Sequence, residues 1–259
     1  MNKNSGKSQH CDALEATSRP THSWIHLPWP PYDTVERAQR AERRRHRSSQ
    51  TMEHIDLSLE QAIARIAIPG VLIGHRLISE GDERGLTPED AEFFANSVLE
   101  RRRASGAARI IARELLARGG YPLAGLRKLP SGAITWPDGA IGSLAHDTRV
   151  AVAAVGKSCD MRALGIDIEP REKLPFDIDL IATPGERLNA LELPYFGRLL
   201  FSAKEAVYKA VHPLDGVFLD FHDVEIDFDQ GSARVAHQRV VELRYRVSSH
   251  IVTAAFLLS

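Results

Sequence analysis

The sequence predicts an α+β protein built from two similar halves. In each half a helix-bearing stretch is followed by β-rich stretches, and this shared order of elements is the main observation. The chain has 259 residues, of which 43% are hydrophobic and 26% are charged, so it can form one large domain or two packed halves. No sequence repeat accompanies this order.

Short β-branched apolar runs predict the strands, because such residues fit a pleated surface. The runs are residues 71–78, 150–155, 165–170, 224–228, 240–247 and 251–258, and a turn signal at residues 136–139 leads into residues 141–146. Residues 170–198 are expected to form an irregular surface segment. We place the N-terminal half at residues 52–155 and the C-terminal half at residues 156–259.

Capping signals predict the helices of the first half. Thr87 is suited to an N-cap, and Pro88 is suited to the first turn that follows. Ser97 and Glu100 have the form of a capping box, which predicts that a second helix begins there. The glycine pair 119–120 is expected to end it.

Composition limits the class of protein. The formal net charge is −1, and no run of 18 apolar residues predicts a membrane span. The first residues have no apolar signal-peptide core. Cys11 and Cys159 are far apart in sequence, so we expect no disulfide framework and a reducing cytoplasm.

Residues 1–51 differ from the rest of the chain. They carry nine Lys or Arg against five Asp or Glu, including the run Arg43-Arg44-Arg45-His46-Arg47. Such a run can be a basic arm for nucleic acid. We favour a disordered basic extension, or residues upstream of a start at Met52, and expect no nucleic-acid partner.

The most informative stretch is Gly-Ile-Asp-Ile-Glu-Pro at residues 165–170. Side chains alternate along a strand, so Asp167 and Glu169 share one face at a separation of roughly 7 Å. Two such carboxylates can hold a hard divalent ion such as Mg²⁺. The alternative is an acidic, solvated strand edge.

A helix is expected over residues 201–209, where Glu205 and Lys209 lie one turn apart. This spacing suits a surface ion pair, but it equally places a general base and a phosphate-binding cation on one face. The acid pair upstream favours the second reading. On the earlier helix, Arg102 and Arg109 share a face and can clamp a phosphate or form a solvated arginine face.

Four ordered motifs resemble one family. GIDIEP, FSAKEAVYK, WPDGAIGSLAH and RIIAR together look like a 4′-phosphopantetheinyl transferase of the surfactin and enterobactin-synthase-component-D group, over residues 70–258. The resemblance implies Mg²⁺-dependent transfer of the phosphopantetheine arm of coenzyme A to a serine of an apo acyl, peptidyl or aryl carrier protein. Adenosine 3′,5′-bisphosphate is released. It also implies a monomeric pseudo-dimer with the active site in the cleft between its halves, and a place in secondary metabolism such as siderophore biosynthesis.

The resemblance also implies residue roles at the metal end of the site. Asp167, Glu169 and Glu205 match the metal-binding acids of the family, and Glu205 is in addition the candidate base. Lys204 and Lys209 match lysines near the transferred pyrophosphate. We count Glu205 and Lys209 as catalytic.

At the nucleotide end, the matches are to phosphate-binding residues. Ser143 and His146 match the phosphate-contacting pair of a Gly-Ser-x-x-His motif, although His146 on its own also suits a bond to a backbone carbonyl. Arg109 matches an arginine that holds the 3′-phosphate of coenzyme A. Arg101 aligns with its upstream companion, and Arg102 is the alternative.

Two departures concern this nucleotide end. The family often has Glu-Phe within the arginine helix, where this chain has the small residues Ala104–Ala107. It often has a basic residue near the position of Ser131, where Arg127 and Lys128 are the nearest basic residues; we assign Lys128 to coenzyme A. The competing functions are a Mg²⁺-dependent nuclease and an inactive binding module of the same fold.

Overall fold

The computed structural model describes residues 57–122, 125–129, 131–187, 193–235 and 239–259. The predictions for residues 1–51 and for Cys11 lie outside these ranges. Residues from Ile55 to Ser259 group as one unit. No helix among the described residues is long and apolar enough to cross a membrane.

Two antiparallel sheets contain the described strands. The first has the order β1-β3-β2 and consists of β1 (Leu72–Leu77), β2 (Ala140–His146) and β3 (Val150–Lys157). The second has the order β4-β8-β7-β6-β5 and consists of β4 (Met161–Pro170), β5 (Val224–Asp227), β6 (Ser232–Val235), β7 (Arg239–Val247) and β8 (His250–Leu258). All six predicted strands are confirmed, and β2 and β6 are additional ones.

Two 20-residue helices dominate the helical part, α4 (Leu99–Arg118) and α6 (Phe196–Asp215). Shorter helices are α2 (Leu57–Ala64), α3 (Pro88–Phe93) and α5 (Pro184–Arg187), with 3₁₀ turns η2 (Asp82–Gly85), η3 (Ile178–Leu180) and η4 (Phe221–Asp223). Segment 170–198 therefore contains η3, α5 and the start of α6.

The helix ends follow the predictions with one exception. Thr87 caps α3 and forms a capping box with Asp90. Gly120 has a φ of 78° just beyond α4, a backbone conformation that glycine adopts without strain. The capping box predicted at Ser97 is wrong, because Val98 is the N-cap of α4 and makes no side-chain capping bond.

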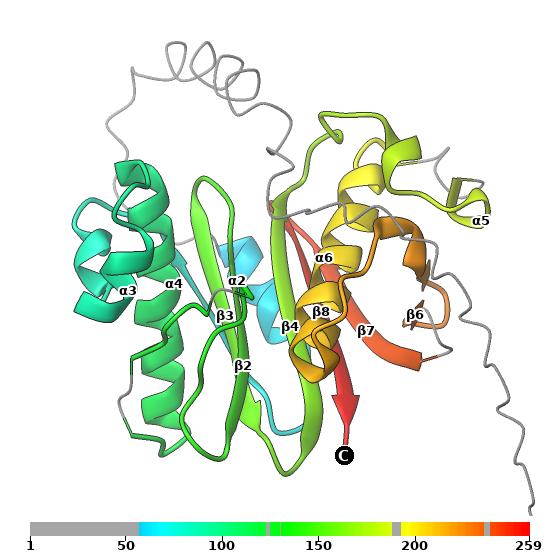
Figure 1. Cartoon of the computed structure of the whole chain (residues 1–259). Coiled ribbons are helices and arrows are strands. Elements are labelled where there is room, and N and C mark those ends of the chain that lie inside the picture. Colours follow the sequence, from blue (N-terminus) through cyan, green and yellow to red (C-terminus); the bar gives the residue numbers. More distant parts are fainter. Residues whose placement is uncertain (1–56, 123–124, 130, 188–192, 236–238) are drawn as a thin grey trace, which may run out of the picture. The chain divides into compact units, whose positions relative to one another are not determined.

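The four layers are helix, sheet, sheet and helix. Helix α4 packs on the first sheet and α6 packs on the second, on either side of the paired sheets (Figure 1). Apolar residues fill the space between the sheets, among them Val152 and Ala154 of β3 and Ile166 and Ile168 of β4. The predicted α+β fold is confirmed, and its two helix-on-sheet halves are consistent with the predicted pseudo-dimer.

The halves meet where β2 lies against β4. The backbone N–H of Ile166 donates to Ser143 Oγ over 3.0 Å, and both groups are buried. Asp147, just after β2, lies 3.2 Å from the ring of His250 on β8 (Oδ2 to Nε2), and these side chains are also buried. The chain passes from the first sheet to the second between Lys157 and Met161.

Gly165 sets the distance between α6 and β4. A Cβ at this position would lie 2.0 Å from the carbonyl oxygen of Ala206, far inside van der Waals contact. The helix therefore rests directly on the strand. This close packing brings the next polar side chains of β4 within reach of α6.

Candidate active site

The candidate site is built on the contact between β4 and α6. Ile166 and Ile168 face the space between the sheets, so the alternation predicted for β4 turns Asp167 and Glu169 toward α6. Lys209 Nζ donates to Asp167 Oδ1 over 2.5 Å. Arg198 Nη1 donates to Glu169 Oε2 over 2.6 Å.

The acidic side chains of this site have raised pKa values. Burial, together with the charge of Asp167, raises the pKa of Glu169 to about 8 against the opposing effect of Arg198. Burial also raises the pKa of Asp167 and of Glu205, and the negative charge of Asp167 adds to the effect on Glu205. Desolvation lowers the pKa of Lys209, but Asp167 and Glu205 outweigh it and leave that pKa raised.

The acid cluster fits a hard cation, although it is not arranged as a finished metal centre. Among the described residues, no three His, Cys, Asp or Glu side chains gather closely enough to hold a metal ion. Asp167 Oδ2 is nevertheless buried without a hydrogen-bond partner in the described part of the chain. An unpartnered carboxylate oxygen among raised-pKa acids is suited to a divalent cation.

Basic side chains lie beside these acids, toward α4. Desolvation and the charges of Lys209 and Arg101 lower the pKa of His146 to about 4, against its contacts with Asp147. Burial, then the charges of Arg101, Arg109 and Lys209, lowers the pKa of Lys128. His146 is therefore neutral near pH 7, and a bound anion would relieve the repulsion among the remaining charged groups, so this cluster is suited to a phosphate.

Arg109 is buried rather than open to the site. Its Nε donates to the carbonyl of Leu126 and its Nη1 to that of Ser105, over 3.1 and 3.2 Å. Its Nε also lies 3.1 Å from Oδ1 of the buried Asp90. Nη2 is buried without a hydrogen-bond partner within the described ranges, so its N–H groups are unused, but a ligand would reach them only if the surrounding structure opened.

Two residues, Arg101 and Arg102, can be the arginine that accompanies Arg109 in the predicted coenzyme A site. Arg101 is exposed, and its charge acts on both His146 and Lys128. Arg102 is half-buried, and its Nε has no hydrogen-bond partner in the part of the chain described. Both stay predictions. Ser143 is buried, and its hydroxyl oxygen accepts the bond from Ile166 that joins the two halves.

The structure does not bring Lys204 to this cluster. Its ammonium is completely buried and donates to Glu186 Oε2 over 2.7 Å. It also donates to three carbonyl oxygens, those of Ile181, Phe221 and Val224. These bonds occupy the donors of Lys204, so we correct the expectation that it contacts pyrophosphate and assign it to the support of α6.

Sequence reasoning missed Arg198 and Glu186. Arg198 precedes Glu205 by seven residues, a spacing that puts both on one helix face and could have drawn attention to it. Glu186 did have a local signal, because Thr183-Pro184-Gly185-Glu186 has the form of a capping box, and the backbone N–H of Thr183 donates to Glu186 Oε2 over 2.8 Å. Its other partners, Lys204 and the N–H of Ile226 at 2.6 Å, come from distant segments and could not be predicted.

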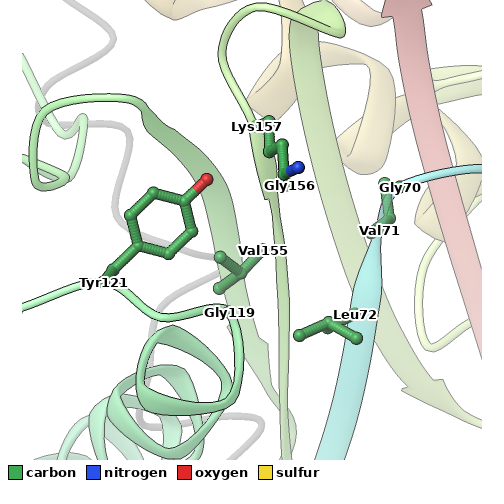
Figure 2. A pocket seen from close by; sticks show the side chains of 8 residues that line it. All are labelled: Gly70, Val71, Leu72, Gly119, Tyr121, Val155, Gly156 and Lys157. Atoms are coloured by element: carbon green, nitrogen blue, oxygen red, sulfur yellow. The ribbon is translucent and has the colours of Figure 1, made fainter.

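A separate cavity of about 300 Å³ lies at the other end of α4. Figure 2 shows Tyr121, Val155 and Leu72 around it, with Lys157 beside them. The remaining lining residues are Gly70, Val71, Gly119 and Gly156. None of the predicted site residues lines this cavity, so it has no part in the candidate site.

Two family models match the chain in succession. Residues 89–156 match the 4′-phosphopantetheinyl transferase N-terminal domain, and residues 163–255 match the 4′-phosphopantetheinyl transferase superfamily. The chain belongs to this superfamily. The predicted resemblance and the predicted enzyme class are confirmed, and the change from one match to the next falls at the change of sheet.

Three curated transferases are similar to the chain. The 4′-phosphopantetheinyl transferase PptT of Mycobacterium tuberculosis is 40% identical over 158 residues, which are 58% of this chain and 70% of PptT. The transferase Svp of Streptomyces mobaraensis is 39% identical, over 56% of this chain and 61% of Svp. The transferase Npt of Nocardia iowensis is 37% identical, over 64% of this chain and 78% of Npt. The match thus spans somewhat less than two thirds of Svp and more than two thirds of the other two.

Proposed function

We propose that this transferase moves the 4′-phosphopantetheine group of coenzyme A to a serine of an apo carrier protein. One observation carries the proposal: Glu205 and Lys209 on α6 face Asp167 and Glu169 on β4. All four residues lie inside the second family match. Acids and cations on one helix–strand contact suit a reaction that cleaves a diphosphate.

In the proposed reaction the serine oxygen forms a bond to the phosphorus that carries the pantetheine arm. The bond from that phosphorus to the leaving phosphate breaks, and adenosine 3′,5′-bisphosphate departs with the electron pair. Glu205 takes the serine proton; its raised pKa suits a base that works near neutral pH. Lys209 leaves Asp167 to bind the diphosphate.

A divalent cation, which we take to be Mg²⁺, would be held by Asp167, Glu169 and Glu205. When bound, it neutralises charge that develops on the phosphate oxygens. Lys209 engages Oδ1 of Asp167 and Arg198 engages Oε2 of Glu169 here, so the cation would be held by the other oxygen of each carboxylate.

The cationic side of the site is proposed to hold the rest of coenzyme A. Lys128, the neutral ring of His146 and the arginine at position 101 or 102 would surround the diphosphate, and Arg109 would hold the 3′-phosphate through Nη2 after the coenzyme uncovers this buried nitrogen. The hydroxyl oxygen of Ser143 accepts a hydrogen bond from Ile166, and its O–H can still donate to a phosphate.

We further propose a monomer that works in the cytoplasm on carriers of secondary metabolism, siderophore carriers included. Cys159 has a free, exposed thiol, which suits a reducing compartment. Size-exclusion chromatography with light scattering tests the monomer, and fractionation of the producing cells tests the compartment.

The test of function is incubation of the full chain with coenzyme A, Mg²⁺ and a panel of apo acyl, peptidyl and aryl carriers. Intact mass spectrometry should show one carrier gaining the mass of one phosphopantetheine, with the gain lost when the carrier serine is replaced by alanine. A panel that stays unmodified while the chain cleaves a nucleic-acid phosphodiester would favour the nuclease.

A further inference from the structure

Arg198 is a half-buried cation that the proposed reaction does not use. It lies in the first turn of α6, and its bond to Glu169 joins two side chains that are each 13% exposed. Its Nε is buried without a hydrogen-bond partner among the described residues. Arg198 is therefore directed to the acid cluster rather than to solvent.

One face of α6 presents charges of alternating sign to β4. Arg198, Glu205 and Lys209 follow one another at spacings of seven and four residues, which places them on the same side of the helix. Arg198 meets Glu169, and Lys209 meets Asp167. Three carboxylates and two basic groups leave the cluster with a formal charge of only −1.

A divalent cation that approaches this cluster alone meets two positive charges, which offset most of the attraction of the three carboxylates. In a partly buried site the repulsion by these charges is much stronger than in water. Lys209 is 28% exposed on a flexible stem, so it can turn toward an arriving anion. Arg198 is more deeply held and engages only Oε2 of Glu169, which leaves Oε1 to face a cation.

We propose, building on the function proposed above, that Arg198 is a positioning residue that makes divalent-cation binding depend on coenzyme A. It acts through Glu169, by aiming that carboxylate and by balancing its charge. The coenzyme brings a negative diphosphate, which attracts Lys209 away from Asp167 and offsets the remaining charge of Arg198. Cation and coenzyme therefore bind together.

The test is calorimetric titration of MgCl₂ into the full chain, first without and then with coenzyme A. The variants are Arg198→Gln, Arg198→Lys, which keeps the charge, and Arg187→Gln, a control at the exposed ion pair with Asp179. Without coenzyme, Arg198→Gln should bind Mg²⁺ at least about tenfold more tightly than the wild type. In the wild type, Arg198→Lys and Arg187→Gln, coenzyme A should tighten Mg²⁺ binding by about tenfold or more.

Equal Mg²⁺ affinity of Arg198→Gln and wild type without coenzyme would overturn the proposal, as would Mg²⁺ binding to no variant even with coenzyme. If Arg198→Gln unfolds without metal, its thermal unfolding is followed against MgCl₂. If MgCl₂ restores folding of Arg198→Gln at concentrations that do not change the melting temperature of Arg198→Lys, the proposal is supported. If MgCl₂ does not restore folding, the proposal is overturned. A wild type that couples Mg²⁺ to coenzyme A but modifies no carrier would refute the proposed function alone.

Discussion

Replacing Lys204 by methionine should destabilise the fold far more than it affects the chemistry. The substitution removes an ammonium that donates to Glu186 and to three backbone carbonyls, while a side chain of similar length remains. Glu186 then stays buried at 3% exposure, with its charge uncompensated. Removing one partner of a buried ion pair costs about 3–5 kcal/mol. Typical domains have a total stability of about 5–15 kcal/mol, so this loss is a large fraction.

Urea unfolding followed by circular dichroism measures this loss. Lys173→Met, at an exposed lysine, is the matched control and should leave the unfolding midpoint nearly unchanged. The double variant Lys204→Met with Glu186→Gln should recover part of the stability, because it removes the stranded charge and keeps a side-chain oxygen that accepts from a backbone N–H. A Lys204→Met protein that keeps its stability but loses transfer and coenzyme A affinity would refute this reasoning and return Lys204 to the pyrophosphate.

Four further predictions follow from the site. Asp167→Ala, Glu169→Ala and Glu205→Ala should each abolish carrier modification while circular dichroism shows a folded protein; activity within about tenfold of wild type in all three, at saturating Mg²⁺, contradicts the metal site. Arg109→Ala should weaken coenzyme A by about ten- to hundredfold, with a much smaller effect on dephospho-coenzyme A. Equal losses in a binding titration would show that Arg109 does not read the 3′-phosphate. Without metal, the free energy of unfolding should fall as pH rises from about 4.5 to about 8, because folded Glu169 keeps a proton that the unfolded chain has released. Urea titrations across this pH range should show that the free energy of unfolding of Glu169→Gln depends less on pH than that of the wild type. A chain that starts at Met52 should melt within a few degrees of the full chain and modify its carrier at a similar rate at physiological salt; failure to fold would place residues 1–51 in the domain.

Local periodicity was sufficient to predict the acid strand. Along β4, the period of two turns the isoleucines to the space between the sheets and the acids to α6, and that alternation is complete within six residues. The one-turn spacing of Glu205 and Lys209 likewise predicted that both act on the same neighbours. Both share Asp167 as an electrostatic partner.

The place of Lys204 could not be predicted in this way. It is next to Glu205 in sequence, but successive helical residues point about 100° apart, so the two side chains leave α6 in different directions. Which direction leads to the site depends on carbonyls from residues 181, 221 and 224, all supplied by the tertiary fold. The capping box at Ser97 failed for a related reason: a pattern of four residues does not fix which of them has extended backbone, and here it is Val98.

The absence of a side chain at Gly165 sets the distance between α6 and β4 at the candidate site. Because α6 touches the strand there through backbone atoms, the gap across which Glu205 and Lys209 face Asp167 is set by main-chain thickness and not by adjustable side chains. An alanine at this position would act as a wedge, lifting the helix and widening every distance across the site together. The spacing at the centre of the site is therefore fixed by one absent methyl group.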